Sequence, residues 1–476
     1  MSITISRSAG ASLLARLAGL PLFALCCTLP DQTLAQSAPA VSTIFAFAGS
    51  QAHSGPIVGP DGALYGTSVA STSTTGGLVY RATADGTSIR TLYQLRLEDG
   101  YTPQAGLILG SDGAFYGATR LGHLAETNTS GTIYRLAPDG TGFRTLHRFA
   151  NYSATNQNSN PVNTDGAFPE SELVEGSDGY LYGMTRAGGS NGTGVVFRLT
   201  RDGSDFRVLH EFGAVTSAAE TGIVVNADGA APVGALVAAA DGYFYGVTST
   251  GGADGRGTVF RLRFDGTAFE SLHAFSATTS SGTNLPTNVG GATPLVGLLD
   301  GQDGFLYGAA GQGGASGSGT LFAIAPDGAV FTVLHDFDGT NGTQPSGALA
   351  LGRDGRLYGT TFSGGTGSGG SSTNLGTIFS IGRDGTGFTR LYVFDQNQGG
   401  NPVGRMLQLT DTVFVGVTQS GARCGQGTLY RMSFAGDTVE GNTRCGQRKN
   451  SGGGAMAPGL LLIVGLLGLA RRRIQR

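Results

Sequence analysis

One short segment recurs along the chain and limits the folds available to it. It reads Asp-Gly, any residue, an aromatic residue or leucine, then Tyr-Gly, and its six copies start at Asp61, Asp112, Asp178, Asp241, Asp303 and Asp354. A degenerate seventh copy runs from Asp411 to Gly416. Consecutive copies start 51 to 66 residues apart. A period near 50 residues predicts a β-propeller or a solenoid, because each unit must bury its apolar surface against the next.

Each repeat is expected to hold four short strands. The first begins nine residues before the aspartate, at a proline in six repeats and at Ala52 in the first repeat, and the second is the Leu-Tyr-Gly segment. The third reads Gly-Thr-Val-Phe-Arg-Leu, as at Gly257–Leu262, and the fourth ends in Leu-His-x-Phe, as at Leu146–Phe149. β-branched and aromatic residues of this kind favour strands. Asp-Gly pairs join the first strand to the second and the third to the fourth, which predicts an antiparallel meander with tight turns.

The two ends of the repeat array decide between a ring and a solenoid. The seventh repeat has a third strand at Gly427–Met432 but no Leu-His-x-Phe segment after it. A segment of the fourth-strand type, Thr43–Phe47, stands alone before the first repeat. A ring explains this lone strand, because it completes the last blade and removes an open edge. We therefore predict an all-β, seven-bladed β-propeller of four-stranded blades over residues 42–433, its last blade closed by the N-terminal strand. The alternative is that residues 434–440 supply the seventh fourth strand.

The N-terminus has the composition of a secretory signal. Arg7 and Arg16 precede an apolar stretch, Leu17–Cys27, and small residues at Thr33–Ala35 offer a cleavage site. Charge, apolar core and small-residue exit in this order predict a signal peptide over residues 1–35. We expect the chain to be exported.

The C-terminus is also ordered in composition. Gly452, Gly453 and Gly454 lead into sixteen mostly apolar residues, Ala455–Ala470, and then Arg471–Arg473. A helix of sixteen residues spans about 24 Å, short of the roughly 30 Å hydrocarbon core. A retained membrane helix with positive-inside arginines is one interpretation. We favour a processed sorting and anchor segment over residues 452–476, held in the membrane only transiently.

The body between these ends excludes one class of partner. It contains 24 basic and 32 acidic residues, a net charge near −8, and a single lysine, Lys449. Such a surface has no basic footprint for nucleic acid, so no nucleic-acid partner is expected. Two cysteines remain, Cys424 and Cys445, and in an exported chain we predict that they pair. The disulfide would tie an exit linker, residues 434–451, to the last repeat. Metal binding is the weaker alternative, because no Cys-x-x-Cys or nearby histidine accompanies them.

No residue set points to catalysis. One repeat position carries a histidine in four repeats and a tyrosine in two, which favours packing over chemistry; these residues are His147, His210, His273, His335, Tyr93 and Tyr392. An aspartate-rich run begins at Asp336, but it has Asn341 and Gly347 at the positions where a calcium loop needs glycine and glutamate. We predict no catalytic residue, no cofactor and no metal ligand, and that the protein is not an enzyme.

Loop lengths single out one face. The connection from a fourth strand to the next first strand runs 19 or 20 residues at Phe149–Pro169, Phe212–Pro232 and Phe275–Pro294, against eight elsewhere. In a meander these connections leave on the same side as those between second and third strands, and loops on a rigid scaffold often bind ligands. The candidate ligand-contacting residues on this side are Arg120, His123, Glu126, Arg186, Asp254 and Arg256. Drift in tolerated insertions is the alternative. Deleting residues 151–167 and 214–230 is expected to leave folding intact and abolish binding.

The repeat resembles the GloVer tandem repeats, a family first noted in Gloeobacter and Verrucomicrobia. The matching residues are Asp354–Thr361, the Gly-Gly that follows, and Gly257–Leu262. The resemblance implies a surface protein with one of several C-terminal anchors and supplies no established biochemical activity. The tail resembles the GlyGly-CTERM signals recognised by rhombosortase, which implies a sorting protease at the membrane as a partner and a place on the outer cell surface or outside the cell.

Three functions remain open. The first is a non-catalytic scaffold that binds an unidentified surface ligand, a glycan or a protein. The second is an exported glycan-acting hydrolase or lyase on a propeller scaffold, and the third is a structural surface component that self-associates. Sugar-cleaving sites need paired carboxylates and often use exposed aromatic platforms, whereas this chain has no tryptophan and no evident carboxylate pair. The sequence favours the first.

Overall fold

The computed structural model describes residues 38–70, 76–122, 127–156, 159–217, 223–280, 285–365, 374–422 and 424–435. The chain divides into two compact units, Met1–Ser37 and Ala38–Arg476, and every described residue belongs to the second. Within the described residues each regular element is a strand. No helix among them is long and apolar enough to cross a membrane.

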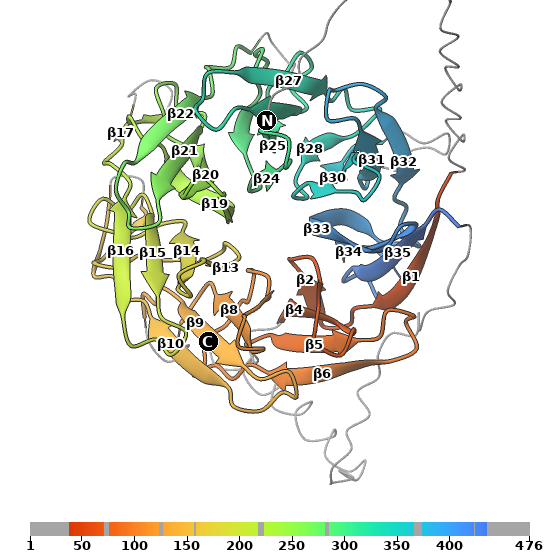
Figure 1. Cartoon of the computed structure of the whole chain (residues 1–476), viewed down its shortest axis with the longest axis horizontal. Coiled ribbons are helices and arrows are strands. Elements are labelled where there is room, and N and C mark those ends of the chain that lie inside the picture. Colours follow the sequence, from red (N-terminus) through yellow and green to blue (C-terminus); the bar gives the residue numbers. More distant parts are fainter. Residues whose placement is uncertain are drawn as a thin grey trace, which may run out of the picture. The chain divides into compact units, whose positions relative to one another are not determined.

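Most strands of the second unit form seven antiparallel sheets arranged as the blades of a ring (Figure 1), and two further two-stranded sheets lie in the connections between blades. Blade 1 contains β2 (Ser50–Ala52), β3 (Ile57–Val58), β4 (Leu64–Ala70), β5 (Leu78–Ala82) and β6 (Ile89–Gln94). Blade 2 contains β7 (Ile108–Leu109), β8 (Phe115–Thr119), β9 (Thr132–Leu136) and β10 (Arg144–Arg148). Blade 3 contains β13 (Val174–Glu175), β14 (Leu181–Thr185), β15 (Val195–Leu199) and β16 (Phe206–Glu211). Blade 4 contains β19 (Ala230–Ala238), β20 (Tyr243–Thr250), β21 (Thr258–Arg263) and β22 (Glu270–Ala274).

The remaining blades follow the same plan, with the first strand innermost and the fourth outermost (Figure 1). Blade 5 contains β23 (Ala292–Pro294), β24 (Leu299–Asp300), β25 (Leu306–Gln312), β26 (Thr320–Ile324) and β27 (Phe331–Asp336). Blade 6 contains β28 (Thr343–Pro345), β29 (Ala350–Leu351), β30 (Leu357–Ser363), β31 (Thr377–Ile381) and β32 (Thr389–Val393). Blade 7 contains β33 (Gly400–Thr410), β34 (Val413–Ser420), β35 (Thr428–Ser433) and β1 (Ala40–Ala46).

The N-terminal strand closes the ring. β1 pairs antiparallel with β35, so that Ala40 lies opposite Ser433 and Ala46 opposite Thr428. Ile44 of this strand is only 1% exposed. The predicted seven-bladed propeller, with its last blade completed by the first strand of the body, is confirmed. β1 therefore occupies the fourth-strand position of blade 7, which the alternative assigned to residues 434–440.

The recurring Asp-Gly-x-x-Tyr-Gly segment has a physical explanation in each blade. In blade 3 the Tyr182 hydroxyl donates to Oδ2 of Asp178 at 2.6 Å, and Oδ1 of the same carboxylate accepts the Tyr180 N–H at 3.2 Å. A Cβ on Gly183 would lie 2.6 Å from Cζ of Phe197, so the aromatic ring of the third strand requires glycine there. The motif therefore joins a tight turn to the packing between the second and third strands.

The apolar core is divided among the interfaces between blades. Seven clusters of buried side chains are present, and each draws on two neighbouring blades. Because both faces of a blade are covered, the strands are apolar on both sides and do not alternate.

The first strand of each blade is less regular than expected. We predicted that it begins at the proline, but in blades 2 and 3 the strands begin at Ile108 and Val174, five residues after Pro103 and Pro169. The residue before each proline has a left-handed φ of 52° to 61°, uncommon outside glycine; these residues are Thr102, Phe168, Ala231, Thr293, Gln344 and Asn401. Each donates its N–H to a carbonyl of the preceding blade. These donors join blade to blade and are therefore lost to the ladder within the blade.

Candidate ligand-binding face

The connections leave each blade at two ends that differ in character. The Asp-Gly turns lie at one end, which we call the turn face. The connections from second to third strands and from each fourth strand to the next blade lie at the other end, which we call the loop face. Among the described residues, the longest connections between strands are on the loop face.

Each of the three long connections on the loop face contains a hairpin with few paired residues. β11 (Ala154–Thr155) pairs with β12 (Pro161–Val162), and β17 (Thr216–Ser217) pairs with β18 (Val224–Val225). In the third connection Thr279 and Thr287 form an antiparallel bridge. We refer to them as insertion hairpins 1, 2 and 3. They follow one another at three consecutive junctions between blades 2 and 5.

An asparagine fixes each insertion hairpin to the blade that follows it. The side chain of Asn226 donates to the carbonyls of Gly213 and Gly229, at 2.9 and 2.7 Å. Its Oδ1 accepts the N–H groups of Gly229 and Gly252, both at 3.0 Å. Asn163 and Asn288 make the same four bonds in hairpins 1 and 3. Both donors and the acceptor of the amide are used, so each hairpin has a defined position.

A charged cluster lies at the inner end of the loop face. Glu170, which follows Pro169 on the approach to β13, accepts a hydrogen bond from Nε of Arg120 at 2.5 Å. Nη1 of Arg186 lies 3.9 Å from the other oxygen of the same carboxylate. The Arg120 guanidinium also lies over the ring of Phe168, 4.6 Å from its centroid. Arg120 and Arg186 directly follow β8 and β14, so residues from two blades meet at one carboxylate.

A neutral pair occupies the same position at another junction. His53 stands in blade 1 where Glu170 stands in blade 3, and Gln419 stands in blade 7 where Arg120 stands in blade 2. Nε2 of Gln419 donates to Nδ1 of His53 at 2.9 Å. Burial lowers the pKa of His53, and the charge of Glu170 opposes this effect. Polar side chains of blades 7, 1, 2 and 3 therefore share the inner end of the loop face.

Two further charged residues stand two positions further along the chain than Glu170 and its counterparts in the other blades. Five blades carry glycine or alanine at this repeat position, namely Gly55, Gly106, Ala235, Gly297 and Ala348. Blade 3 carries Glu172 there and blade 7 carries Arg405. A Cβ on Gly106 would lie 2.7 Å from Cδ of Glu172, so the small residue makes room for the carboxyl group. Burial raises the pKa of Glu172, and the charge of Arg405 opposes this. Blades 3 and 7 are not neighbours, so these two residues belong to different sides of the ring.

Comparison with known protein families identifies the repeat. The profile of the Gloeobacter/Verrucomicrobia repeat matches residues 53–286, 223–371 and 287–443, which together span nearly the whole ring. The chain belongs to this repeat family. No curated protein matches the sequence.

Several solved structures resemble the Gloeobacter/Verrucomicrobia repeat ring at low identity. The oligogalacturonate lyase of Vibrio parahaemolyticus is 9% identical, with a TM-score of 0.48 over 83% of this chain and 93% of that one. A putative 6-phosphogluconolactonase of Bacteroides uniformis is 16% identical, with a TM-score of 0.44 over 75% and 92% of the two chains. A chain of a nidogen–laminin complex is 14% identical, with a TM-score of 0.40 over 72% and 96%. Scores of this size carry no argument about activity.

The candidate residues of this repeat protein fall into separate places. Arg120 and Arg186 meet at Glu170, as described above. Asp254 instead accepts the N–H of Ala277 at 3.0 Å and so supports insertion hairpin 3. The carbonyl of Arg256 accepts the Thr293 N–H at 2.8 Å in the joint between blades 4 and 5. The structure therefore does not bring Asp254 and Arg256 together with the two arginines of blades 2 and 3.

Other expectations for this repeat protein concern residues outside the described ones. His123 and Glu126 are among these, as are the glycines of the tail, Gly452, Gly453 and Gly454. Cys424 is described and lies between β34 and β35, whereas Cys445 is not. The disulfide, the signal peptide and the sorting segment stay predictions.

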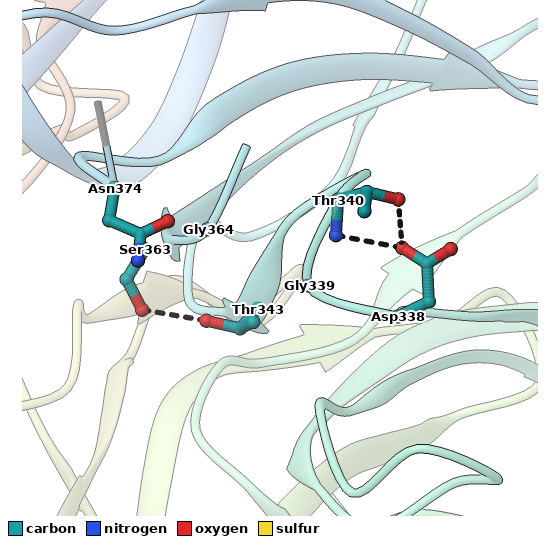
Figure 2. A pocket seen from close by; sticks show the side chains of 7 residues that line it. All are labelled: Asp338, Gly339, Thr340, Thr343, Ser363, Gly364 and Asn374. Atoms are coloured by element: carbon teal, nitrogen blue, oxygen red, sulfur yellow. Dashed lines mark hydrogen bonds between the residues drawn. The ribbon is translucent and has the colours of Figure 1, made fainter. Parts of the chain in front are cut away.

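A hollow of about 290 Å³ opens on the loop face between blades 5 and 6 of the repeat ring, where the connection is short. Hydroxyl, amide and carboxylate groups line it together with two glycines; the lining residues are Asp338, Gly339, Thr340, Thr343, Ser363, Gly364 and Asn374. Figure 2 shows that its polar groups pair with one another. The hydroxyls of Thr343 and Ser363 lie 2.7 Å apart, and Asp338 accepts two bonds from Thr340.

Sequence reasoning missed Glu170, Glu172 and Arg405. The signal that points to them is a departure from the Gloeobacter/Verrucomicrobia repeat itself. Glu172 and Arg405 replace glycine or alanine at an inner-strand position. Charged residues that interrupt such a position are candidates for function, because the repeat has no structural use for them there.

Proposed function

We propose that this protein is an exported, non-catalytic binding scaffold that recognises a surface ligand on its loop face. One observation carries the proposal: three consecutive junctions each hold an insertion hairpin, and each hairpin is fixed by an asparagine with four hydrogen bonds. Neutral drift favours loops of varied length and no shared brace. A repeated brace is typical of loops that must keep one shape.

Fixed loops suit recognition for an energetic reason. Ordering a loop on binding costs about 0.5–1.5 kcal/mol for each immobilised side chain with many rotamers, and a loop that is already fixed avoids much of this cost. The turn face offers no comparable surface, because its short Asp-Gly connections repeat from blade to blade. The loop face is therefore the better candidate for a selective contact.

The test is to shorten the hairpins and leave their braces in place. Residues 154–162 and 216–225 are each replaced by a short Gly-Ser linker in the full-length chain, with Asn163 and Asn226 kept. Deleting the longer segments 151–167 and 214–230 is less clean. It also removes both asparagines and Asp165, which accepts the N–H of Ala150 at 2.9 Å.

Binding is measured on a glycan array and, for proteins, on immobilised surface extracts. We expect the shortened variant to have the same melting temperature as the original chain. Its affinity for the glycans or proteins that the original chain binds is expected to fall at least ten-fold. Arg353→Gln on the turn face serves as the control and is expected to bind normally. Unchanged binding by the shortened variant would reject the loop face as the recognition surface.

A second candidate function is an exported glycan-acting hydrolase or lyase. One observation favours it: Glu170 and Glu172 lie two residues apart on the approach to β13, in different surroundings. Glu170 is next to two arginines, whereas burial raises the pKa of Glu172. Two carboxyl groups whose environments differ in this way suit a general acid and its partner.

The enzyme alternative is tested with a panel of neutral and acidic polysaccharides, by following new reducing ends and unsaturated products. If the chain is an enzyme, Glu172→Gln removes the activity while leaving the melting temperature unchanged. If the original chain releases no product from any polysaccharide of the panel, this alternative loses its support.

A further inference from the structure

The inner end of the loop face gathers charges that the other inner strands lack. We call Arg120, Glu170, Arg186, Glu172 and Arg405 the axial cluster. It contains three arginines and two glutamates, an excess of positive charge in a body whose net charge is near −8. Blades 4, 5 and 6 contribute no charged residue at these repeat positions. An anion approaching this part of the ring therefore meets a local excess of positive charge.

Arg186 keeps its guanidinium available within this cluster. Arg120 takes one oxygen of Glu170 at 2.5 Å, whereas Nη1 of Arg186 stays 3.9 Å from the other. A charge-assisted hydrogen bond has a length of about 2.7–2.9 Å. The Arg186 side chain is also 50% exposed, against 29% for Arg120. Glu170 and Phe168 thus hold Arg120 in place, and the planar fork of Arg186 remains open to a ligand.

Arg405 is a second available cation. It is exposed, and among the described residues neither its side chain nor that of Glu172 takes part in a hydrogen bond or a close ion pair. A carboxyl group and a guanidinium that take part in no hydrogen bond within the described residues are suited to a ligand that carries both an anion and hydroxyl groups.

We propose that the axial cluster binds a sugar acid, a small molecule with one carboxylate and several hydroxyl groups. Arg186 and Arg405 receive the carboxylate, since a guanidinium matches its two oxygens. Glu172 and the His53–Gln419 pair bind hydroxyl groups, which both donate and accept hydrogen bonds. This inference rests on the proposed function, because it assigns a ligand class to the same loop face.

The remaining inner residues suit the apolar edges of such a ligand. At the position of Glu170 and His53, blades 4, 5 and 7 carry Val233, Leu295 and Val403. Leu295 directly follows β23 and is 38% exposed. A sugar ring has C–H faces as well as hydroxyl groups, and these aliphatic side chains offer contact to them. Phosphate has no C–H groups and would therefore gain nothing from contact with these aliphatic side chains.

The proposal is tested by calorimetric titration of the full-length chain with D-galacturonate and D-gluconate. D-glucose lacks the carboxylate and acetate lacks the hydroxyl groups, so both are expected to bind at least ten-fold more weakly. Arg186→Gln and Arg405→Gln are each expected to weaken galacturonate binding at least ten-fold. Arg186→Lys keeps the charge without the fork and is expected to have an intermediate affinity.

Arg353→Gln is the matched control, because it removes the same charge from the turn face, where Arg353 pairs with Asp411 at 2.9 Å. Melting curves of all variants establish that the chains are folded. No binding of either acid, equal binding of glucose, or an equal loss in the control would each overturn the proposal. If the hairpin deletions abolish binding on the array while Arg186→Gln and Arg405→Gln do not, the loop-face function stands and the sugar-acid site falls. If neither change affects binding, both fall.

Discussion

The imidazole of His147 lies flat on the ring of Phe206 in the next blade, with 3.7 Å between centroids and 1° between planes. The pairs His210–Phe269, His273–Phe331 and His335–Phe388 repeat this contact. The stack joins the outermost strands of neighbouring blades. The repeated histidine thus has a structural use in every blade that carries it.

Phe206→Ala is expected to lower the free energy of unfolding by about 2–4 kcal/mol, because it removes a large ring and its stacked contact. The measurement is urea denaturation of the full-length chain. Arg207→Ala, one residue further along the strand and 61% exposed, is the control and is expected to change stability by less than about 0.5 kcal/mol. Equal stability of the two variants would mean that the stack adds nothing.

One of these histidines lacks a partner that two others have. His147 and His210 bond to Asp165 and Asp228, at 3.0 and 3.2 Å, whereas Gly290 takes the place of the aspartate near His273. Burial lowers the pKa of His273 to about 4. A Cβ on Gly290 meets only Cε1 of Phe331, at 3.7 Å, so a side chain fits there. We predict that Gly290→Asp raises the pKa of His273, measured by NMR titration of the imidazole.

The same substitution is expected to change the pH dependence of stability. In the original chain His273 is neutral when folded, so its contribution is fully present above its unfolded pKa of about 6.5 and is lost as the pH falls toward 4. In the Gly290→Asp variant the new carboxylate pairs with the protonated imidazole, and less stability is lost. Between pH 8 and pH 5 we expect the Gly290→Asp variant to lose about 1–2 kcal/mol less of its free energy of unfolding than the original chain loses. Gly290→Ala adds the Cβ without the carboxylate, and a similar gain from it would contradict the explanation.

Closure of the ring by β1 is tested at Ile44. This side chain is 1% exposed and contacts Gly86 of blade 1. Ile44→Ala is expected to cost about 2–4 kcal/mol, because it opens a cavity between blades 7 and 1. Ser42→Ala on the same strand, only partly buried, is the control. A melting temperature unaffected by Ile44→Ala would show that the N-terminal strand contributes little to closure.

The pairing of Cys424 with Cys445 remains to be tested. If they pair, a loop of about 20 residues is closed, and reduction is expected to lower stability by roughly 2–4 kcal/mol. Thermal melts with and without reductant measure this. Cys424→Ser is the matched control: reductant should shift the melt of the original chain and leave that of the variant unchanged. An unshifted melt of the original chain would speak against the disulfide.

Some residues of the candidate site could be predicted from the sequence and others could not. Arg120 and Arg186 were found because they stand where loops begin. Glu170, which joins them, was missed because it follows a proline in a segment expected to be plain strand. Asp254 and Arg256 have the same sequence character as the two arginines but support a hairpin and a joint. Loop membership alone does not separate these roles.

The amino-acid sequence alone was enough to establish the number of blades, their strand order and the closing role of Thr43–Phe47. These depend on local chemistry: Asp-Gly accepts the φ of a tight turn, and a tyrosine hydroxyl reaches the aspartate four residues before it. The electrostatic effect of Arg405 on Glu172 depends on the folded ring, because 233 positions separate the two residues in the chain. Their approach depends on the curvature of seven packed blades, which no single repeat encodes.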